Sequence, residues 1–300
     1  MNSKISFLGT GGSIPTKERS LPSIVVKYDS ELLMFDCGEG TQRQMGIAGL
    51  SPAKKMKIFI SHMHGDHVLG LPGLMQSMAL LGRENSLDIY GPKGIRRFIE
   101  SVSDAVQFNP TFPVHVHEIR AGQIQDERLY EIHSARADHV VSCLGYSFVE
   151  KPRPGKFNVQ MARRLEIPEG PLWKTLQMGR PVIVNGRKFD PHRIVGPSRP
   201  GIKIVYATDT RPAPRIVSLA LKADVLIHDA CFDSSLEEKA SRDGHSTAAQ
   251  AASVAKKAKV RKLVLTHISA RYRDPAPLLR EAKKIFPNTV LASDLMTVDL

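Results

Sequence analysis

The chain has 300 residues, 42% of them hydrophobic, and its 42 Lys and Arg against 30 Asp and Glu give a formal net charge of +12. This length allows one large domain or two small ones with a sizeable core, and the charge favours a polyanionic partner such as nucleic acid. No apolar run could cross a bilayer, no signal peptide is recognisable, and the cysteines (Cys37, Cys143 and Cys231) lack CxxC spacing, so we expect a cytoplasmic protein without membrane segments, disulfides or thiolate metal sites.

The first residues read as strands separated by turns, with strands expected at 5–8, 23–27 and 32–35. The glycine-rich turn 9–13 lacks the GxGxxG and GxxxxGK[ST] patterns, so we interpret it as a close approach to another backbone segment and not as a phosphate site. Asp36 follows the third strand. It is placed either to accept a hydrogen bond from a metal-bound imidazole or to cap the helix expected over 42–46.

The most informative stretch is Ser-His-Met-His-Gly-Asp-His at residues 61–67, directly after the apolar run 58–60. Neutral imidazoles and carboxylates are the usual ligands of zinc and similar ions, and they bind best where they converge at the end of a rigid strand. Gly65 would permit a tight turn among them. A single HxH pair usually binds no metal, but three imidazoles and a carboxylate within six residues predict a metal site.

Helical spacing over 69–81 places this histidine cluster in a strand-to-helix loop, and a strand at 87–90, a helix at 94–106 and a strand at 114–119 follow. His115 and His117 form a second HxH pair without a neighbouring carboxylate or glycine. Strand alternation puts both on one solvated face, so we predict that they bind no metal. His139 lies between strands expected at 129–133 and 144–149 and is the next candidate ligand.

Residues 150–200 differ from the rest of the chain. Between 151 and 199 there are seven prolines, five glycines, and eleven Lys or Arg against three acids, which gives a net charge of +8. Such proline density fits neither a central strand nor a long helix, so we predict an extended insertion with short helices near Gln160 and Trp173. The alternative is a flexible, non-specific loop. Trp173, the only tryptophan, is expected to anchor a small core of the insertion.

Strand–helix alternation resumes at 203, with strands expected at 203–207, 225–228, 262–266 and, last, 289–292, and helices at 214–222, 248–258 and 276–285. Asp209, Asp229 and His267 each follow one of these strands. The carboxyl ends of such strands can gather residues from distant parts of the sequence at one sheet edge. His245 precedes the helix 248–258, for which Ser246 or Thr247 is a plausible N-cap.

Four motifs together resemble the ribonuclease Z family of the metallo-β-lactamase superfamily. They are FLGTGGSIPT at 7–16, FDCGEGTQRQ at 35–44, HGDH with GLPGL at 64–74, and LTHISARY at 265–272. The resemblance covers nearly the whole chain. It implies a single α/β metallo-β-lactamase domain over 1–300, built as a four-layer αββα sandwich, with a protruding basic arm at 150–200 that binds tRNA. It also implies a homodimer that removes 3′ trailers from tRNA precursors.

The resemblance further implies two zinc ions per subunit, although imidazole and carboxylate ligands also accept manganese or iron. It assigns one ion to His62, His64 and His139 and the other to Asp66, His67 and His267, with Asp209 bridging both. Asp66 would accept the proton of the attacking water. His245, oriented by Asp229, would protonate the O3′ leaving group, so that the tRNA keeps a 3′ hydroxyl and the trailer a 5′ phosphate.

Two positions depart from the family pattern. Thr208 stands where glycine is expected before Asp209, a change that we expect to alter only local backbone freedom. Asp229 stands where glutamate is expected, which shortens the side chain expected to orient His245. The alternative is that His245 faces solvent at the start of its helix.

Two other functions compete with the ribonuclease Z interpretation. A dinuclear hydrolase acting on small phosphodiesters or thioesters would have no need of an insertion with a net charge of +8. A non-catalytic RNA-binding homologue would have no chemical need for all seven candidate metal ligands. Both features therefore favour a metal-dependent ribonuclease.

Overall fold

The computed structural model describes residues 3–300 and divides into two compact units. The first unit comprises the chain up to Asp126 together with Ile132–Phe148 and Lys203–Leu300. The second comprises Glu127–Glu131 and Val149–Ile202, and so includes the basic segment 150–200. Within the described residues, every helix is too short or too polar to cross a membrane.

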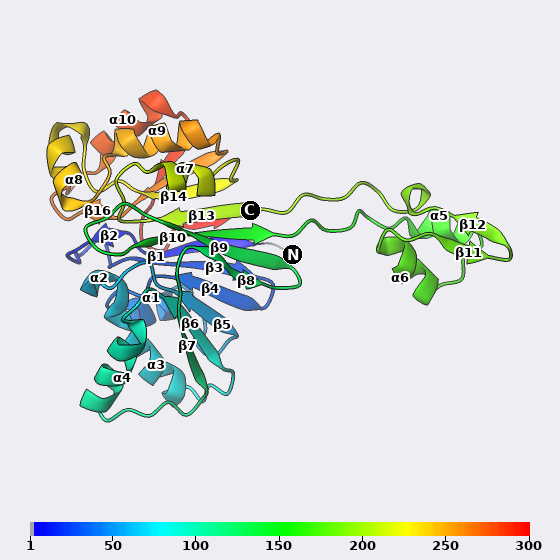
Figure 1. Cartoon of the computed structure of the whole chain (residues 1–300), viewed down its shortest axis with the longest axis horizontal. Coiled ribbons are helices and arrows are strands. Elements are labelled where there is room, and N and C mark those ends of the chain that lie inside the picture. Colours follow the sequence, from blue (N-terminus) through cyan, green and yellow to red (C-terminus); the bar gives the residue numbers. More distant parts are fainter. Residues whose placement is uncertain (1–2) are drawn as a thin grey trace. The chain divides into compact units, whose positions relative to one another are not determined.

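Two seven-stranded mixed sheets form the centre of the first unit (Figure 1). The first sheet has the order β18-β1-β3-β4-β5-β6-β7, antiparallel from β18 to β4 and parallel from β4 to β7. Its strands are β1 (Lys4–Gly9), β3 (Ser23–Tyr28), β4 (Glu31–Phe35), β5 (Met56–Phe59), β6 (Leu87–Gly91), β7 (Val114–Glu118) and β18 (Thr297–Asp299). Strands β4 and β5 are buried along their whole length, as expected for parallel strands covered on both faces.

The second sheet has the order β17-β15-β14-β13-β10-β9-β8, and β13, β14, β15 and β17 are mutually parallel. Its strands are β8 (Gly122–Asp126), β9 (Tyr130–Arg136), β10 (Leu144–Glu150), β13 (Lys203–Ala207), β14 (Val225–Asp229), β15 (Lys262–Thr266) and β17 (Thr289–Leu291). Aromatic rings join the two sheets: Phe35 lies 5.8 Å from Tyr206 and 6.0 Å from Tyr146 between ring centroids. The inner faces of the two sheets therefore pack on each other through aromatic side chains.

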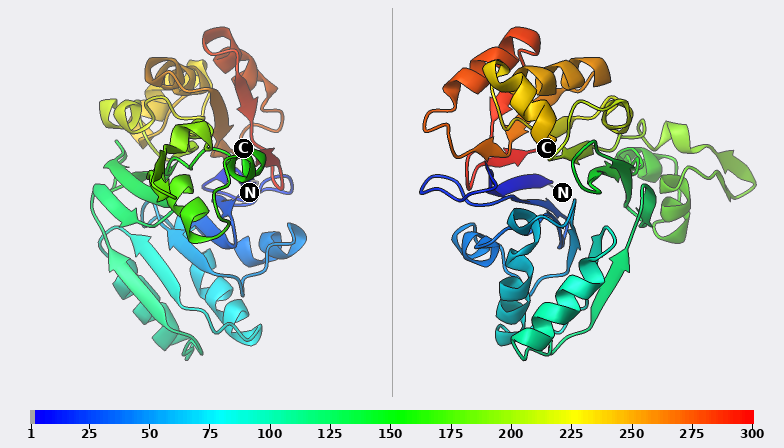
Figure 2. Two further views of the ribbon diagram at one scale, coloured as in Figure 1. Left: turned by 90° about the vertical axis from the view of Figure 1, so that its right-hand side faces the viewer. Right: turned by 60° about the vertical axis from the view of Figure 1, so that its left-hand side comes forward.

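Helices cover the outer face of each sheet (Figures 1 and 2). On the first sheet lie α1 (Thr41–Ile47), α2 (Gly65–Val68), α3 (Gly70–Leu80) and α4 (Ile95–Ala105). On the second lie α7 (Pro214–Leu219), α9 (Ala248–Ala258) and α10 (Ala276–Ile285), while α8 (Glu237–Asp243) packs through Ala240 on Cys231 and Phe232 beyond the end of β14. Five buried alanines of α9 let this helix approach the sheet closely, and Thr247 caps it in a capping box with Gln250. The predicted four-layer αββα sandwich is confirmed.

The predicted elements are present with shifted boundaries, but several others were not predicted. Strand β8 is short, polar and mostly exposed, and α8 is a charged helix of seven residues after a 3₁₀ turn at Ser234–Leu236. The expectation that the last strand lies at 289–292 was wrong, because β18 follows it and pairs with β1. Two-residue strands β2 (Gly11–Gly12) and β16 (Ile268–Ser269) also pair in parallel.

The second unit has a hydrophobic core of its own. It contains α5 (Val159–Arg164), α6 (Pro171–Gln177), the hairpin of β11 (Val182–Val184) and β12 (Arg187–Phe189), and a 3₁₀ turn at Pro191–Arg193. The Trp173 ring packs on Phe157 with 5.2 Å between centroids, and its Nε1 donates to Ile167 O at 3.0 Å. The segment therefore has a folded structure of its own and is not a flexible loop, and Trp173 anchors the small core as expected.

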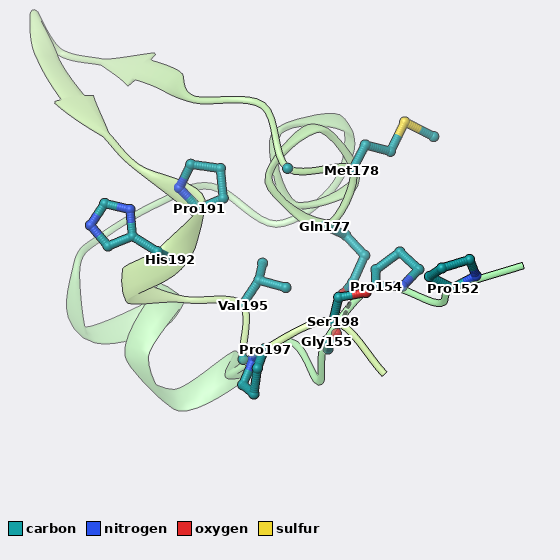
Figure 3. Close-up of a pocket in the computed structure, with 12 residues that line it drawn as sticks. Pro152, Pro154, Gly155, Gln177, Met178, Pro191, His192, Val195, Pro197 and Ser198 are labelled. Atoms are coloured by element: carbon teal, nitrogen blue, oxygen red, sulfur yellow. Dashed lines mark hydrogen bonds between the residues drawn. The ribbon is translucent and has the colours of Figure 1, made fainter. Parts of the chain in front are cut away.

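Prolines line a cavity of about 550 Å³ in this unit (Figure 3). Pro152, Pro154, Pro191 and Pro197 form much of the wall, and Gln177 is held in it by donating from Nε2 to Gly155 O at 2.6 Å. The two ends of the segment meet beside the cavity, where Arg153 and Arg199 form an antiparallel bridge. The proline density of the sequence thus builds a closed, ordered structure.

Candidate metal centre

Strand register brings the candidate ligands to one edge of the first unit. Phe35 pairs with Phe59 at the carboxyl ends of β4 and β5, and Asp229 pairs with Thr266 at the ends of β14 and β15. The residues that follow the ends of β4, β13 and β15 turn sharply: Asp36, Asp209 and His267 have φ of 57°, 49° and 59°. Non-glycine residues rarely adopt this left-handed conformation, and it persists where packing enforces it, commonly at functional sites.

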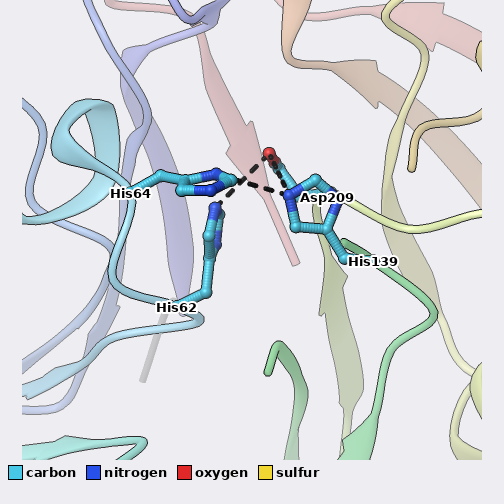
Figure 4. A group of neighbouring side chains, drawn as sticks. All are labelled: His62, His64, His139 and Asp209. Atoms are coloured by element: carbon cyan, nitrogen blue, oxygen red, sulfur yellow. Dashed lines mark hydrogen bonds and ion pairs between the residues drawn. The ribbon is translucent and has the colours of Figure 1, made fainter. Parts of the chain in front are cut away.

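A first group of side chains contains His62, His64, His139 and Asp209 (Figure 4). His62 Nε2 lies 3.6 Å and His139 Nε2 3.9 Å from Asp209 Oδ2, and His139 Nε2 lies 3.4 Å from His64 Nδ1. These residues come from three distant stretches of sequence. The structure therefore gathers the first predicted ligand set around a single point.

A second group contains Asp66, His67 and His267. The Nε2 atoms of His67 and His267 lie 3.4 and 3.5 Å from Asp66 Oδ2, and 3.4 and 3.2 Å from Asp209 Oδ1. The two oxygens of Asp209 therefore face different groups, Oδ2 the first and Oδ1 the second. This is the geometry expected of a carboxylate that bridges two ions.

The donor atoms fit a divalent metal ion. The Nε2 atoms of His62, His67 and His267 are buried and have no hydrogen-bond partner among residues 3–300. Ligand atoms placed tetrahedrally at 2.0–2.1 Å from an ion lie about 3.4 Å apart, close to the separations above. A buried polar atom without a hydrogen-bond partner destabilises the folded state. Metal ions in the space between these nitrogens would provide the missing partners.

Asp36 supports one histidine of each group through hydrogen bonds. Its Oδ2 accepts from His67 Nδ1 at 2.7 Å and from the Tyr206 hydroxyl at 2.8 Å. The Ser61 hydroxyl also donates to Asp36 and lies 3.0 Å from His62 Nδ1, so Asp36 orients His62 indirectly. The alternative role of Asp36 as a helix cap was wrong, because Gly40 occupies the N-cap of α1. Such supporting carboxylates fix the tautomer of a ligand histidine.

The glycine-rich turn 9–13 makes the close backbone approach that was predicted. A Cβ on Gly9 would lie 1.8 Å from Leu21 O, and one on Gly12 would lie 2.7 Å from the His267 ring. The turn also has a role that the sequence did not reveal: Ser13 N donates to Asp66 Oδ2 at 2.9 Å. In contrast, Gly65 makes no tight turn, because it is the first residue of the short helix α2.

At both positions that depart from the family pattern, the side chain makes hydrogen bonds at the metal centre. The Thr208 hydroxyl donates to Asp209 Oδ1 at 2.7 Å, so the expectation that Thr208 alters only backbone freedom was wrong. Asp229 Oδ2 lies 3.0 Å from His245 Nδ1 and also accepts from Ser246 N at 3.2 Å. His245 is only 8% exposed, so the alternative that it faces solvent is wrong. The shorter aspartate still reaches its histidine.

The opposite charges of the centre shift one another's protonation. Burial alone would raise the pKa of Asp209, but His267, His67 and His62 outweigh it and hold that pKa well below its usual value. Burial alone would lower the pKa of His267, but Asp209 and Asp66 outweigh it and raise that pKa to about 9. The pKa of His67 is likewise raised well above its usual value, since Asp209 and Asp36 overcome its burial.

Residues that the sequence analysis set aside lie elsewhere. His117 Nε2 lies 2.9 Å from Asp88 Oδ1, and neither His115 nor His117 joins a group of potential ligands. The three cysteines are buried and free, and burial raises the pKa of Cys37 to about 12. Cys231 does lie beside Asp229, His245 and His267, but burial raises its pKa too, which disfavours the thiolate that a metal would need.

Comparisons with known proteins agree with this geometry. A family model described as anti-Pycsar protein Apyc1 matches residues 3–142, and a family model described as beta-lactamase superfamily domain matches residues 193–268.

Full-length relatives identify the family more closely. The chain is 45% identical over 297 residues to ribonuclease Z of Methanothermobacter thermautotrophicus, covering 99% of this chain and 96% of the relative. It is 44% identical over 298 residues to ribonuclease Z of Methanosarcina acetivorans, covering 99% and 98%. The crystal structure of human short-form tRNase Z matches with a TM-score of 0.71, 28% identity and 98% of each chain covered. The chain therefore belongs to the ribonuclease Z family of the metallo-β-lactamase superfamily.

Proposed function

We propose that this protein is a zinc-dependent endoribonuclease that removes 3′ trailers from tRNA precursors, leaving a 3′ hydroxyl on the tRNA and a 5′ phosphate on the trailer. The observation that carries the proposal is the position of Asp209, whose two oxygens face two separate groups of histidines. Full-length relatives named ribonuclease Z support the choice of substrate. Zinc is favoured because the donor set is rich in imidazole.

In this proposal each subunit holds two ions. His62, His64 and His139 would hold one, Asp66, His67 and His267 the other, and Asp209 would join them. When bound, such a pair supplies a nucleophile at neutral pH by lowering the pKa of water to about 7, and it neutralises charge on the phosphoryl oxygens. The hydrogen bonds from His67 Nδ1 to Asp36 and from His139 Nδ1 to Gly244 O leave both Nε2 atoms free to act as ligands.

Protein groups would handle the protons. The contacts of Asp66 fall on Oδ2, which leaves Oδ1 to accept the proton of the attacking water. Burial alone would lower the pKa of His245, but Asp229 outweighs it and raises that pKa to about 9, so the ring carries a proton at neutral pH. With Nδ1 held by Asp229, His245 would donate from Nε2 to the departing O3′ atom.

The basic segment 150–200 would bind the tRNA body. Its net charge of +8 over 151–199 suits the phosphate backbone, and its own core gives it a fixed shape. Proteins recognise double-stranded RNA mainly through phosphates and shape, so such a segment needs no sequence-reading helix. We further propose that the enzyme is a cytoplasmic homodimer. Dimerisation would cover exposed apolar side chains such as Ile47 and Leu80, which are 52% and 89% exposed.

The direct test is incubation of the purified protein with a defined tRNA precursor, with and without a chelator, followed by analysis of the ends of both fragments. We expect cleavage that requires metal, a 3′ hydroxyl on the tRNA and a 5′ phosphate on the trailer. Uncleaved RNA in metal-loaded protein that hydrolyses a small phosphodiester or thioester would favour the small-molecule hydrolase. Binding of the precursor without hydrolysis of any of these substrates would favour a non-catalytic RNA-binding protein.

Metal binding should release protons. The raised pKa values of His67 and His267 mean that both rings are largely protonated at pH 7 without metal, whereas a metal ligand must be neutral imidazole. We expect Zn²⁺ binding at pH 7 to release about one to two protons, and affinity to rise about tenfold per pH unit for each proton until pH about 9. Calorimetry in buffers of different ionisation enthalpy measures this number. Proton-neutral binding would show that both rings are already neutral before the metal binds.

A further inference from the structure

Two adjoining cavities of about 560 and 550 Å³ lie in the first unit beside the metal centre. The inner one is lined by the ligand candidate His139 and by Arg215, and the outer one by Lys93 and Arg120. Arg136 and Ser142 line both, so the two cavities are neighbours. We call them together the basic cleft, with Lys93, Arg120, Arg136 and Arg215 as its cations.

The basic cleft is lined by four cations and two carboxylates, so it keeps a net positive charge. All four cations are exposed, and none forms an ion pair with any residue in the described part of the chain. In the outer cavity the one carboxylate is Glu118, and it accepts from Gly94 N at 2.7 Å. In the inner cavity the one carboxylate is Asp138, which pairs with Arg211 at 3.1 Å. The four free cations therefore favour an anionic ligand.

The walls of the cleft touch the loop that carries the first histidines. Leu144, which lines the outer cavity, donates from its backbone N to Ser61 O at 3.0 Å. A Cβ on Gly94, next to Lys93, would lie 3.9 Å from Met63 Cγ. The cleft thus begins at His139, passes the segment 61–64 and ends at Lys93 and Arg120. A chain of phosphates leaving the reaction centre would meet one cation after another.

We propose that the basic cleft holds the first nucleotides of the 3′ trailer, as a single strand, on one side of the scissile phosphate. This inference rests on the proposed function. Cavities of about this size admit one or two nucleotides each but no duplex. The acceptor stem of a tRNA precursor is paired up to the nucleotide before the cleavage site, whereas its trailer is single-stranded along its length, so the trailer is the part that fits several successive positions. Each phosphate neutralised by a cation also releases counterions, which makes the binding sensitive to salt.

The test measures trailer binding separately from catalysis. A fluorescent RNA of about ten nucleotides with a 5′ phosphate is titrated in chelator with wild type, with Lys93→Ala/Arg120→Ala, and with Lys283→Ala/Lys284→Ala. The last pair removes two exposed charges from α10 and lines neither cavity. We expect the cleft variant to bind about tenfold more weakly, with a salt slope lower by about 1.4 for two lost contacts. The α10 variant should match wild type.

A second measurement distinguishes the trailer from the tRNA body. For precursors with trailers of about one and about ten nucleotides, the cleft variant should lose kcat/KM only with the longer trailer, because Lys93 and Arg120 lie in the outer cavity. Equal loss on both, or weaker binding of mature tRNA, would assign the cleft to the tRNA body and overturn the inference. If wild type cleaves precursors but the cleft variant and the α10 variant bind the trailer RNA with equal affinity, only this inference fails. If wild type leaves precursors intact, the proposed function itself fails.

Discussion

Replacing Asp209 by Asn is expected to lower the rate of precursor cleavage at least about a thousandfold, equivalent to about 4 kcal/mol of transition-state stabilisation. Asp209 is 2% exposed, and its two oxygens face the two groups of histidines, so no other carboxylate in the described chain can replace it between them. An amide is neutral and offers one oxygen where the carboxylate offers two. Single-turnover cleavage with elemental analysis of the bound metal measures both consequences, and we expect less metal per subunit.

Two further variants show whether the effect is specific. Asp88→Asn alters a carboxylate that also contacts an imidazole, that of His117, but lies in no ligand group, and activity should stay within about twofold. Thr208→Val removes the hydroxyl that donates to Asp209 Oδ1, and we expect a loss of about ten- to a hundredfold, as for other residues that orient a ligand. If Asp209→Asn retains a tenth of wild-type activity with full metal content, Asp209 is not a bridging ligand.

Removing the basic segment is expected to weaken precursor binding about a hundredfold or more while leaving hydrolysis of a small phosphodiester within about twofold. Arg153 and Arg199 exchange backbone hydrogen bonds of 3.0 and 2.9 Å, so a two-residue Asn-Gly turn can replace 154–198 between them. The deletion removes eight Lys or Arg and three acids, a net charge of +5. All seven candidate ligands lie in the first unit, which the deletion leaves intact.

A full-length variant separates charge from structure in the segment. Arg163 and Arg164 are exposed on α5, and their replacement by Gln leaves the small core around Ala162 and Trp173 in place. We expect weaker precursor binding with a lower salt slope, by about 0.7 to 0.9 for each lost phosphate contact. Binding curves at several salt concentrations give the slope. If the deletion abolishes both activities, the segment supports the fold of the first unit and is not a separate binding element.

Local patterns in the sequence predicted most of the buried elements and the histidine cluster of 61–67. Apolar runs predicted β4, β5 and β14. Both faces of these strands are buried, so nearly all of their residues are apolar. The histidine cluster in 61–67 was visible because four potential ligands, three imidazoles and one carboxylate, stand within six residues. Elements that bury little, such as β8 and α8, left no such pattern and were missed.

What the sequence by itself determined was therefore the αββα layering, the family, and the identity of the residues that gather at the strand ends. Only the tertiary structure decided how they meet. Asp209 faces both groups, Ser13 N and Thr208 Oγ1 hold two of the carboxylates, and Asp36 supports His67 and, through Ser61, His62. Contacts between residues so far apart in sequence depend on strand register and on left-handed backbone turns, and a one-dimensional pattern of residue types carries neither.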